Sequence, residues 1–316
     1  MDLQQLRIIR HTASCCFNLT RAAEEMYTSQ PGLSRRIREL EEELGIELFI
    51  RTGRRLAGMT EAGKEVLETA CRILAEVGNI QSVPARFGKS GTGVLRLASD
   101  LDLFPPLSSA LKRFYKSYPQ VRLEVRRRDT ASVAATLLHD EADMGIGGER
   151  LRGFRDIIVF PCARTPYRAV IPAAHPLAGA KRLTLEELAR YPLLAGAVGS
   201  DERLAVDNAF TLAGMQPDIV LGADAHCLAA CAASGLGVAL VCDPVAGEAQ
   251  GKTVRIRNAS GLFGFSPVFL GMRRGRLLKD FELRFIRLLA PELDPETVRQ
   301  AANSREPAPY VPGYAI

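Results

Sequence analysis

The chain has 316 residues, of which 47% are hydrophobic and 24% charged, and its formal net charge is +5. This length allows two domains with separate cores, and the small net charge excludes a protein that coats nucleic acid over its whole surface. No run of about 18 apolar residues is present, so no membrane span is expected. The N-terminal MDLQQLRIIRHTA lacks the apolar core of a signal peptide, and seven cysteines without a CxxC pair are typical of reduced thiols. We therefore expect a cytoplasmic protein without membrane contact.

Two helices separated by a tight turn are predicted near the N-terminus, after an opening helix over residues 3–14 that buries Leu3, Leu6 and Ile9. The segment LTRAAEEMY (residues 19–27) has helical apolar spacing, and Thr28-Ser29-Gln30 supplies turn and N-cap chemistry ahead of a proline. The next helix, PGLSRRIRELEEEL, ends at Gly45 in the left-handed conformation. Its inward face carries Leu33, Ile37, Leu40 and Leu44. The pattern predicts a helix-turn-helix whose second helix can enter a major groove.

A two-stranded wing is predicted next. Residues 47–51 and 56–59 have the composition of short strands around the arginine-bearing tip Thr52-Gly53-Arg54-Arg55. Such a tip can lie along phosphates. Thr60 is then expected to cap a further helix.

That helix, over roughly residues 60–82, carries an apolar stripe with a 4-3-4-3 spacing. The stripe consists of Val66, Ala70, Ile73, Val77 and Ile80. Two heptads are short for a coiled coil, and the alternative is a helix that packs on its own domain. We favour a dimerising helix, because a lone winged domain has too little surface to cover the stripe. A dimer would also present two recognition helices to a pseudo-palindromic site.

The run AAEEMYTSQPGLSRRIRELEEELGIELFIRTGRRLAGMTEAGKEVL resembles the winged helix-turn-helix of the LysR-type transcriptional regulators. Within that family, YTSQPGLS together with ELGIELFIRTGRRL is most similar to the CysB-like branch, the regulators of sulfur assimilation. The resemblance continues, more weakly, to about residue 290. It implies promoter DNA as a partner and a small-molecule effector as the controlling signal.

The residues expected to contact DNA combine amide, hydroxyl and guanidinium groups on one short helix and on the wing. Gln30 can pair with an adenine edge, and Arg35 with guanine or a phosphate. Short hydroxyls near a helix start suit phosphate oxygens. Any single arginine could equally be a solvated surface residue. The full set that we predict is Thr28, Ser29, Gln30, Pro31, Ser34, Arg35, Arg38, Arg51 and Arg54.

Beyond a Pro- and Gly-bearing stretch over residues 82–93, short apolar strands alternate with helices of 8–12 residues, which favours an α/β fold with a mainly parallel sheet. The resemblance implies a two-lobed, periplasmic-binding-protein-like effector domain. The whole chain is therefore predicted to be an α+β multidomain protein. Its parts are a winged domain (1–59), a linker helix and hinge (60–92), an effector domain (93–290; lobe I about 93–162 and 267–290, lobe II about 163–266) and a tail (291–316) without assigned structure.

The ligand cleft is expected between the lobes, at strand carboxyl ends and helix N-termini. In the CysB-like branch the turn after the first effector-domain strand is rich in threonine and glutamine and helps to hold an anion, whereas this chain has Ser99-Asp100-Leu101-Asp102. A second turn offers Asp201 and Glu202. Because carboxylates repel anions, we predict an effector with an amino or other cationic group. The predicted lining residues are Ser99, Asp100, Asp102, Asp129, Thr130, Glu149 and Asp201. Alternatively, or in addition, these acids cap helices.

Other chemistry is weakly indicated. Cys227 and Cys231 share a helix face, which leaves a redox-sensing regulator as the alternative function, although buried thiols commonly serve only as small apolar groups. Nucleophile, P-loop, metalloprotease and dinucleotide motifs are absent from the sequence. We therefore expect no enzyme, no cofactor and no metal. A solute-binding protein would share the lobes but not the helix-turn-helix. The expected partners are double-stranded promoter DNA, a small effector, a second or further copies of the chain (homodimer or homotetramer) and, for an activator, RNA polymerase.

Overall fold

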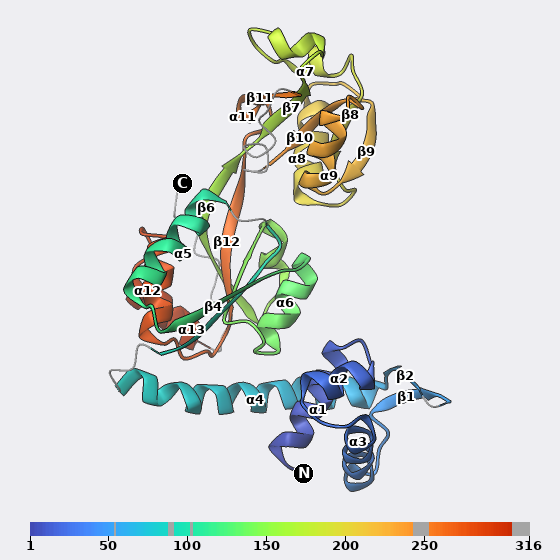
Figure 1. Cartoon of the computed structure of the whole chain (residues 1–316), viewed down its shortest axis with the longest axis vertical. Helices are drawn as coiled ribbons and strands as arrows, with labels where there is room; N and C mark the ends of the chain where they lie inside the picture. The colour runs from blue at the N-terminus through green and yellow to red at the C-terminus, as the bar shows by residue number, and fades with distance from the viewer. Residues whose placement is uncertain (54, 88–91, 102–103, 243–252, 305–316) are drawn as a thin grey trace.

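The computed structural model describes residues 1–53, 55–87, 92–101, 104–242 and 253–304, without the side chains of residues 82 and 84–87. Figure 1 shows an elongated chain with one α/β lobe at the top, a second in the middle, and a long helix with the N-terminal elements at the bottom. Among the helices of the described segments, none has the length and apolarity required to cross a bilayer.

The head, by which we mean residues 1–59, is a winged helix-turn-helix. Its elements are α1 (Leu3–Ser14), α2 (Leu19–Glu25), α3 (Gln30–Leu44), β1 (Phe49–Thr52) and β2 (Arg55–Met59). Ile9, Leu40 and Phe49 are fully buried in its core. Leu3 and Leu44, predicted to face inward, are exposed, because each occupies the end of its helix, where the neighbouring elements no longer cover it.

The predicted caps of the head are confirmed. The Ser29 hydroxyl accepts a hydrogen bond from the Gly32 amide at 3.2 Å. Gly45 ends α3 with a φ of 69°, in the left-handed region that a glycine enters without steric cost. The Thr60 hydroxyl accepts a hydrogen bond from the Gly63 amide at 2.9 Å. These local signals fix where the recognition helix begins and ends.

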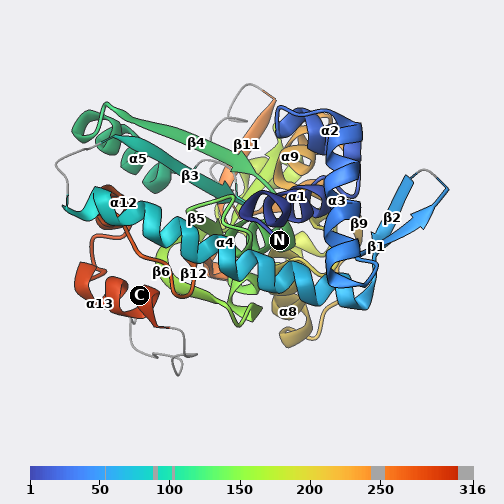
Figure 2. The ribbon, with the colours of Figure 1, turned by 90° about the horizontal axis from the view of Figure 1, so that it is seen from below.

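The linker helix α4 (Glu61–Phe87) continues past the predicted end at residue 82. At a rise of 1.5 Å per residue it spans about 40 Å. Figure 2 shows α4 running beneath lobe I, with α1 beside it. Leu6 of α1 packs against Ala70 and Leu74 of α4 in a small buried cluster. The first half of the helix is thereby attached to the head.

Lobe I, by which we mean the unit around the first five-stranded sheet, has the strand order β4-β3-β5-β12-β6. Its elements are β3 (Gly93–Ser99), α5 (Pro105–Ser117), β4 (Val121–Arg127), α6 (Thr130–Leu138), β5 (Met144–Gly147), the 3-10 helix η1 (Glu149–Gly153), β6 (Ile157–Pro166), β12 (Phe265–Arg273), α12 (Asp280–Leu289) and α13 (Pro295–Asn303). The sequence analysis assigned no structure to the tail that contains α13. Val298 and Ala302 of α13 are buried in the lobe I core.

Lobe II, the unit around the second sheet, has the order β11-β7-β10-β8-β9. Its elements are β7 (Arg168–Pro172), the 3-10 helix η2 (Pro176–Gly179), α7 (Leu185–Leu188), β8 (Leu193–Gly196), α8 (Asp201–Leu212), β9 (Ile219–Ala223), α9 (Ala225–Ala233), β10 (Val238–Val241), β11 (Val254–Asn258) and α11 (Ser260–Phe263). The long antiparallel strands β6 and β12 lead from one lobe to the other.

The prediction of mainly parallel sheets was wrong. In lobe I, β3 pairs in parallel with β4 and β5, but β12 is antiparallel to both β5 and β6. In lobe II, β8 is parallel to β9 and β10, whereas β7 is antiparallel to β10 and β11. The antiparallel pairs arise because the chain crosses between the lobes on β6 and returns on β12. The strand β11 had not been predicted.

Candidate DNA-binding surface and effector cleft

The outer face of α3 and the wing enclose a groove of about 680 Å³. Four residues expected to contact DNA line it together, namely Gln30, Ser34, Arg38 and Arg51. Gln30 is the first residue of α3 and is exposed, as are Thr28 and Pro31 beside it. Amide, hydroxyl and guanidinium groups therefore converge where the sequence analysis placed them.

The arginines of this surface differ in their surroundings. Arg35 is 82% exposed and makes an ion pair with Glu39 one turn further along the helix, at 2.8 Å. Arg51 is more covered, and its Nη2 lies 2.5 Å from Glu41 Oε2. Exposed pairs contribute little to stability, so Arg35 can exchange Glu39 for a base or phosphate at small cost. Arg54 lies outside the described residues.

Glu41 has a structural role that the sequence analysis did not identify. Its Oε1 accepts hydrogen bonds from the backbone amides of Leu48 and Phe49, at 2.9 and 3.2 Å. The same carboxylate pairs with Arg51. It therefore connects the recognition helix to the first wing strand and sets the angle between them.

Tyr27 is a second residue that the sequence analysis missed. Its side chain is 99% exposed, and its backbone has a φ of 52° in the turn between α2 and α3. A bulky residue rarely adopts this conformation. An aromatic residue two positions before the N-cap residue Ser29 was the available signal, and we add Tyr27 to the candidate DNA-contacting residues.

The α4 stripe is divided between two environments. Ala70 is buried against α1, and Val66 packs on the head core. Ile73 and Ile80 are exposed, Ile80 to 70% of its surface, and Val77 is half-buried. The helix thus packs on its own domain through one part of the predicted stripe and leaves the other part uncovered in the single chain.

A polar cleft separates the lobes. It comprises two adjoining hollows of about 550 and 250 Å³. Its walls come from the carboxyl end of β3, the N-terminus of α6 and the segment after β5 on one side, and from the N-termini of α8 and α9 on the other. This matches the expected position at strand carboxyl ends and helix N-termini. The size falls within the usual range of small-molecule sites.

Four of the predicted lining residues line the cleft, namely Asp100, Asp129, Thr130 and Asp201. Asp129 also caps α6, accepting from the Ser132 amide at 3.0 Å. Ser99 does not line the cleft, because its buried hydroxyl bonds back to the amide and carbonyl of Leu101. Glu149 pairs with Arg152 instead. Asp102 lies outside the described residues.

The sequence analysis missed about half of the charged groups in the cleft. They are Arg127, Arg128, Arg150 and Asp224, and they adjoin Ser200 and Glu202 of the turn that was expected to face the cleft. Arg150 bridges the lobes, since its Nη1 donates to the Gly199 carbonyl at 3.0 Å and its amide to Asp201 Oδ2 at 3.2 Å. The available signals were the RRRD run at the end of β4 and the cap position of Asp224 before α9. The cleft is therefore of mixed charge rather than purely acidic.

Asp100 is the most perturbed acid of the cleft. Burial raises its pKa to about 6, and the carboxylates of Glu202 and Asp201 act in the same direction. The Thr130 hydroxyl, which donates to Asp100 Oδ2 at 2.8 Å, opposes the increase. Among the described residues, Asp100 Oδ1 has no hydrogen-bond partner. A cationic donor in the cleft would stabilise the ionised form.

The two thiols of α9, Cys227 and Cys231, are neighbours on one helix face. Cys227 is exposed, and its hydrogen bond with Cys231 raises its pKa. A raised pKa lowers the thiolate fraction on which reactivity depends. The geometry therefore gives the redox alternative no added support.

Comparisons with known proteins agree with this architecture. A model for "Bacterial regulatory helix-turn-helix protein, lysR family" matches residues 3–64, and one for "LysR substrate binding domain" matches residues 88–294. The HTH-type transcriptional regulator Cbl of Escherichia coli (strain K12) is 39% identical over 309 residues, 97% of this chain and 98% of Cbl. The HTH-type transcriptional regulator CysB of Burkholderia cenocepacia is 35% identical over 303 residues, 95% of this chain and 97% of CysB. The solved cofactor-binding domain of the Cbl transcriptional regulator superposes with a TM-score of 0.62 at 33% identity, covering 67% of this chain and 95% of that domain.

A winged head joined by a long helix to two lobes with a polar cleft defines a ligand-controlled, DNA-binding regulator. The chain belongs to the LysR family of bacterial transcriptional regulators. The predicted similarity to the CysB-like branch is confirmed by its relatives.

Proposed function

We propose that this regulator binds double-stranded promoter DNA through the outer face of α3, the turn before it and the wing, and that it responds to a small effector with an amino group. The supporting observation for DNA is the convergence of Gln30, Ser34, Arg38 and Arg51 on one groove. The protein would act beside the chromosome, in the cytoplasm, as a non-enzymatic switch. In an activator, RNA polymerase would be the further partner.

The effector class follows from the charges of the cleft. Carboxylates approach it from both lobes, with Asp100 on one side and Asp201, Glu202 and Asp224 on the other. An ammonium group can pair with several of them at once, whereas a simple anion meets repulsion there. The three arginines of the same walls favour an anionic group elsewhere on the ligand. A small molecule with both an amino and an acidic group therefore suits the cleft best.

Calorimetric titration of the full-length protein tests this class. The probes are sulfate, O-acetylserine and a panel of simple amines. We expect heat of binding from the amino-bearing probes and a higher affinity for those that also carry an acidic group. Tight binding of sulfate, with no binding of any amine, would exclude the proposal.

Binding of an amine is expected to depend on the ionisation of Asp100. Because the pKa of Asp100 is about 6, the carboxylate is mostly protonated at pH 5 and mostly ionised at pH 7. The affinity should therefore rise by about tenfold over this interval. In Asp100→Asn the affinity should be lower and nearly flat with pH. Asp129→Asn is the matched control, because hydrogen bonds from Ser132 lower the pKa of Asp129 and keep it ionised. An unchanged pH profile in Asp100→Asn would contradict this assignment.

We further propose that the exposed part of the α4 stripe pairs two chains. Ile73, Val77 and Ile80 would meet their counterparts in a homodimer, from which a homotetramer could be built. Burying an isoleucine contributes about 1.5–3 kcal/mol. Ile80→Glu should therefore weaken the dimer by at least about tenfold in sedimentation equilibrium. Gln81→Glu introduces the same charge at the next, exposed position and should have little effect. A dimer that withstands Ile80→Glu would place the contact elsewhere.

A further inference from the structure

We propose that lobe I carries a docking surface for α4 and α1 of its own chain, and that α6 connects this surface to the effector cleft. The docking surface consists of residues 139–143 and 274–277. The docking itself is independent of the effector, whereas its connection to the cleft rests on the function proposed above. The placement of the head would then depend on an intrachain contact that the cleft can weaken.

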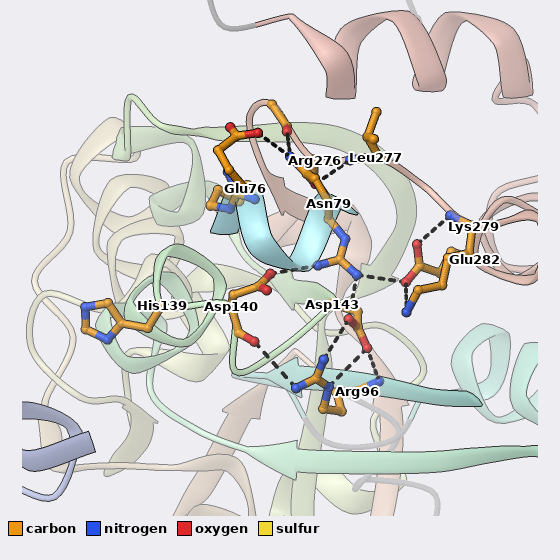
Figure 3. Close-up of polar contacts among 12 residues, drawn as sticks. Glu76, Asn79, Arg96, His139, Asp140, Asp143, Arg276, Leu277, Lys279 and Glu282 are labelled. Atoms are coloured by element: carbon orange, nitrogen blue, oxygen red, sulfur yellow. Dashed lines mark hydrogen bonds and ion pairs between the residues drawn. The ribbon is translucent and has the colours of Figure 1, made fainter. Parts of the chain in front are cut away.

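Asn79 makes the most specific contact of α4 with this surface. Its Nδ2 donates to the Gly275 carbonyl at 2.8 Å, and its Oδ1 accepts from the Leu277 amide at 3.0 Å. The side chain is 8% exposed. Figure 3 shows Asn79 on α4 directed at the turn that carries Arg276 and Leu277. One amide thus satisfies a backbone donor and a backbone acceptor almost 200 residues away in the sequence.

Gly78, the preceding residue, allows α4 to approach the other half of the surface. A Cβ at this position would lie 2.8 Å from Asp140 Oδ2. Asp140 has little freedom to move away, because its Oδ1 accepts from Arg276 Nη1 at 2.9 Å. Glycine is disfavoured in the middle of a helix, and α4 extends well beyond Gly78 on both sides. The close approach to Asp140 accounts for a glycine here.

The head contacts the same surface through α1. Arg10 Nη1 donates to the His139 carbonyl at 2.9 Å. Around this contact several buried polar atoms, Arg10 Nε, His11 Nδ1 and Glu141 Oε1, have no hydrogen-bond partner among the described residues. Burial lowers the pKa of His11, and the Glu141 carboxylate opposes that change. Unpaired buried polar groups are costly, so the docked arrangement is one that can be released.

Arg276 joins the two halves of the surface into one unit. It is buried, and its Nη2 lies 2.5 Å from Asp143 Oδ1 and 2.8 Å from Glu282 Oε1. With the bond to Asp140, the guanidinium connects the 274–277 turn, the segment after α6 and the first turn of α12. Burial alone would raise the pKa of Asp143, but Arg276 and Arg96 reverse this and lower it. Asp143 therefore remains charged, and the ion pairs of Arg276 make the surface move as a whole.

Two elements run directly from the docking surface to the cleft. The helix α6 begins at Thr130, which bonds Asp100 in the cleft, and ends at Leu138, next to the docking residue His139. Its nine residues span about 13 Å. The strand β5 begins beside Asp143 and ends at Gly147, followed by Gly148 in the cleft wall. A displacement of the Thr130 end by a bound ligand is thus carried to residues 139–143.

Distance measurement in the full-length protein tests the docking. Bio-orthogonal residues that carry spin labels replace Tyr27 in the head and Tyr115 in lobe I. These two positions are 99% and 58% exposed. Labelled chains are diluted with unlabelled ones, so that the measured distances lie within one chain. Asn79→Ala removes the hydrogen bonds, and Gly78→Leu places a side chain against Asp140. Gln81→Ala, at an exposed position of the same helix, is the control. Thermal unfolding verifies that each variant is folded.

We expect a narrow distance distribution in the wild-type and Gln81→Ala proteins and a broadened one in Asn79→Ala and Gly78→Leu. Hydrogen exchange in residues 139–143 and 129–133 should be roughly fivefold to tenfold faster in these two folded variants, as expected for one or two lost hydrogen bonds. Distance distributions as narrow as that of the wild type in both Asn79→Ala and Gly78→Leu would overturn the docking. Faster exchange confined to residues 139–143 would overturn its connection to the cleft. Because neither DNA nor effector is used, failure here is separate from failure of the proposed effector class.

Discussion

Gln30→Ala and Arg35→Ala proteins are expected to lose sequence-specific promoter binding while their fold persists. Both side chains are exposed, and the only partner of Arg35 among the described residues is Glu39 one helical turn away, so their removal leaves no cavity. A bidentate contact to a base contributes about 1–3 kcal/mol of discrimination. A dimer with two recognition helices would lose this contact twice. The affinity for the promoter should therefore fall by about 30-fold to more than 10⁴-fold.

Fluorescence anisotropy with an operator duplex and a scrambled duplex measures this specificity. Arg113→Ala, an exposed arginine on α5, controls for the lost charge, and Gln81→Ala controls for the lost glutamine. Both controls should bind as the wild type does. Arg38→Ala should weaken binding to the two duplexes alike and reduce the salt dependence. Retention of the wild-type specificity ratio by both Gln30→Ala and Arg35→Ala would remove these residues from the recognition surface.

Arg276→Leu is expected to destabilise the protein by about 3–5 kcal/mol, because Asp143 and Glu282 would lose their buried, closely bonded cation. Among the described residues, they would keep only Arg96 and Lys279 as ion-pair partners, at 3.3 and 3.8 Å. Urea denaturation monitored in lobe I measures the loss. Arg122→Leu, at a side chain that is 78% exposed, should change the stability by no more than about 0.5 kcal/mol.

The loss of stability caused by Arg276→Leu should become smaller as the pH falls. In the wild type the folded-state pKa of Asp143 is lowered, so its stabilisation is present above the unfolded pKa and is lost only as the pH falls through the folded value. Without Arg276, the effect of burial on Asp143 is opposed by Arg96 but no longer by Arg276, so the folded-state pKa of Asp143 rises and the folded variant gains relative stability on acidification. A deficit that is below about 1 kcal/mol, or constant between pH 7 and pH 5, would contradict the role of the ion-pair cluster.

The head could be predicted in detail because its signals are local. Ser29, Gly45 and Thr60 occupy helix ends, and the hydroxyls of Ser29 and Thr60 each accept a hydrogen bond from the amide three residues further on. The division of the α4 stripe could not be predicted in this way, because Ala70 is covered by a helix more than 50 residues earlier in the chain. The strand β11 and the helix α13 were missed for a similar reason, since each is defined by the sheet or core on which it packs.

The cleft was predicted only in part. Asp100 directly follows the strand β3, and Asp201 begins the helix α8. Sequence patterns identify both kinds of position. Arg150 carries no such signal, and its role depends on the approach of Gly199 and Asp201 from the other lobe. The resulting balance of charge adds an acidic group to the amino group that the sequence analysis expected on the effector. The docking of Asn79 on the 274–277 turn is equally a product of tertiary structure.

Genome-wide footprinting with the purified full-length protein tests the central claim most directly. The account predicts protection of discrete promoter sites with two-fold related half-sites, and loss of that protection with Gln30→Ala under identical conditions. Even coverage of the genome by the wild-type protein, or the same discrete sites with Gln30→Ala, would contradict it.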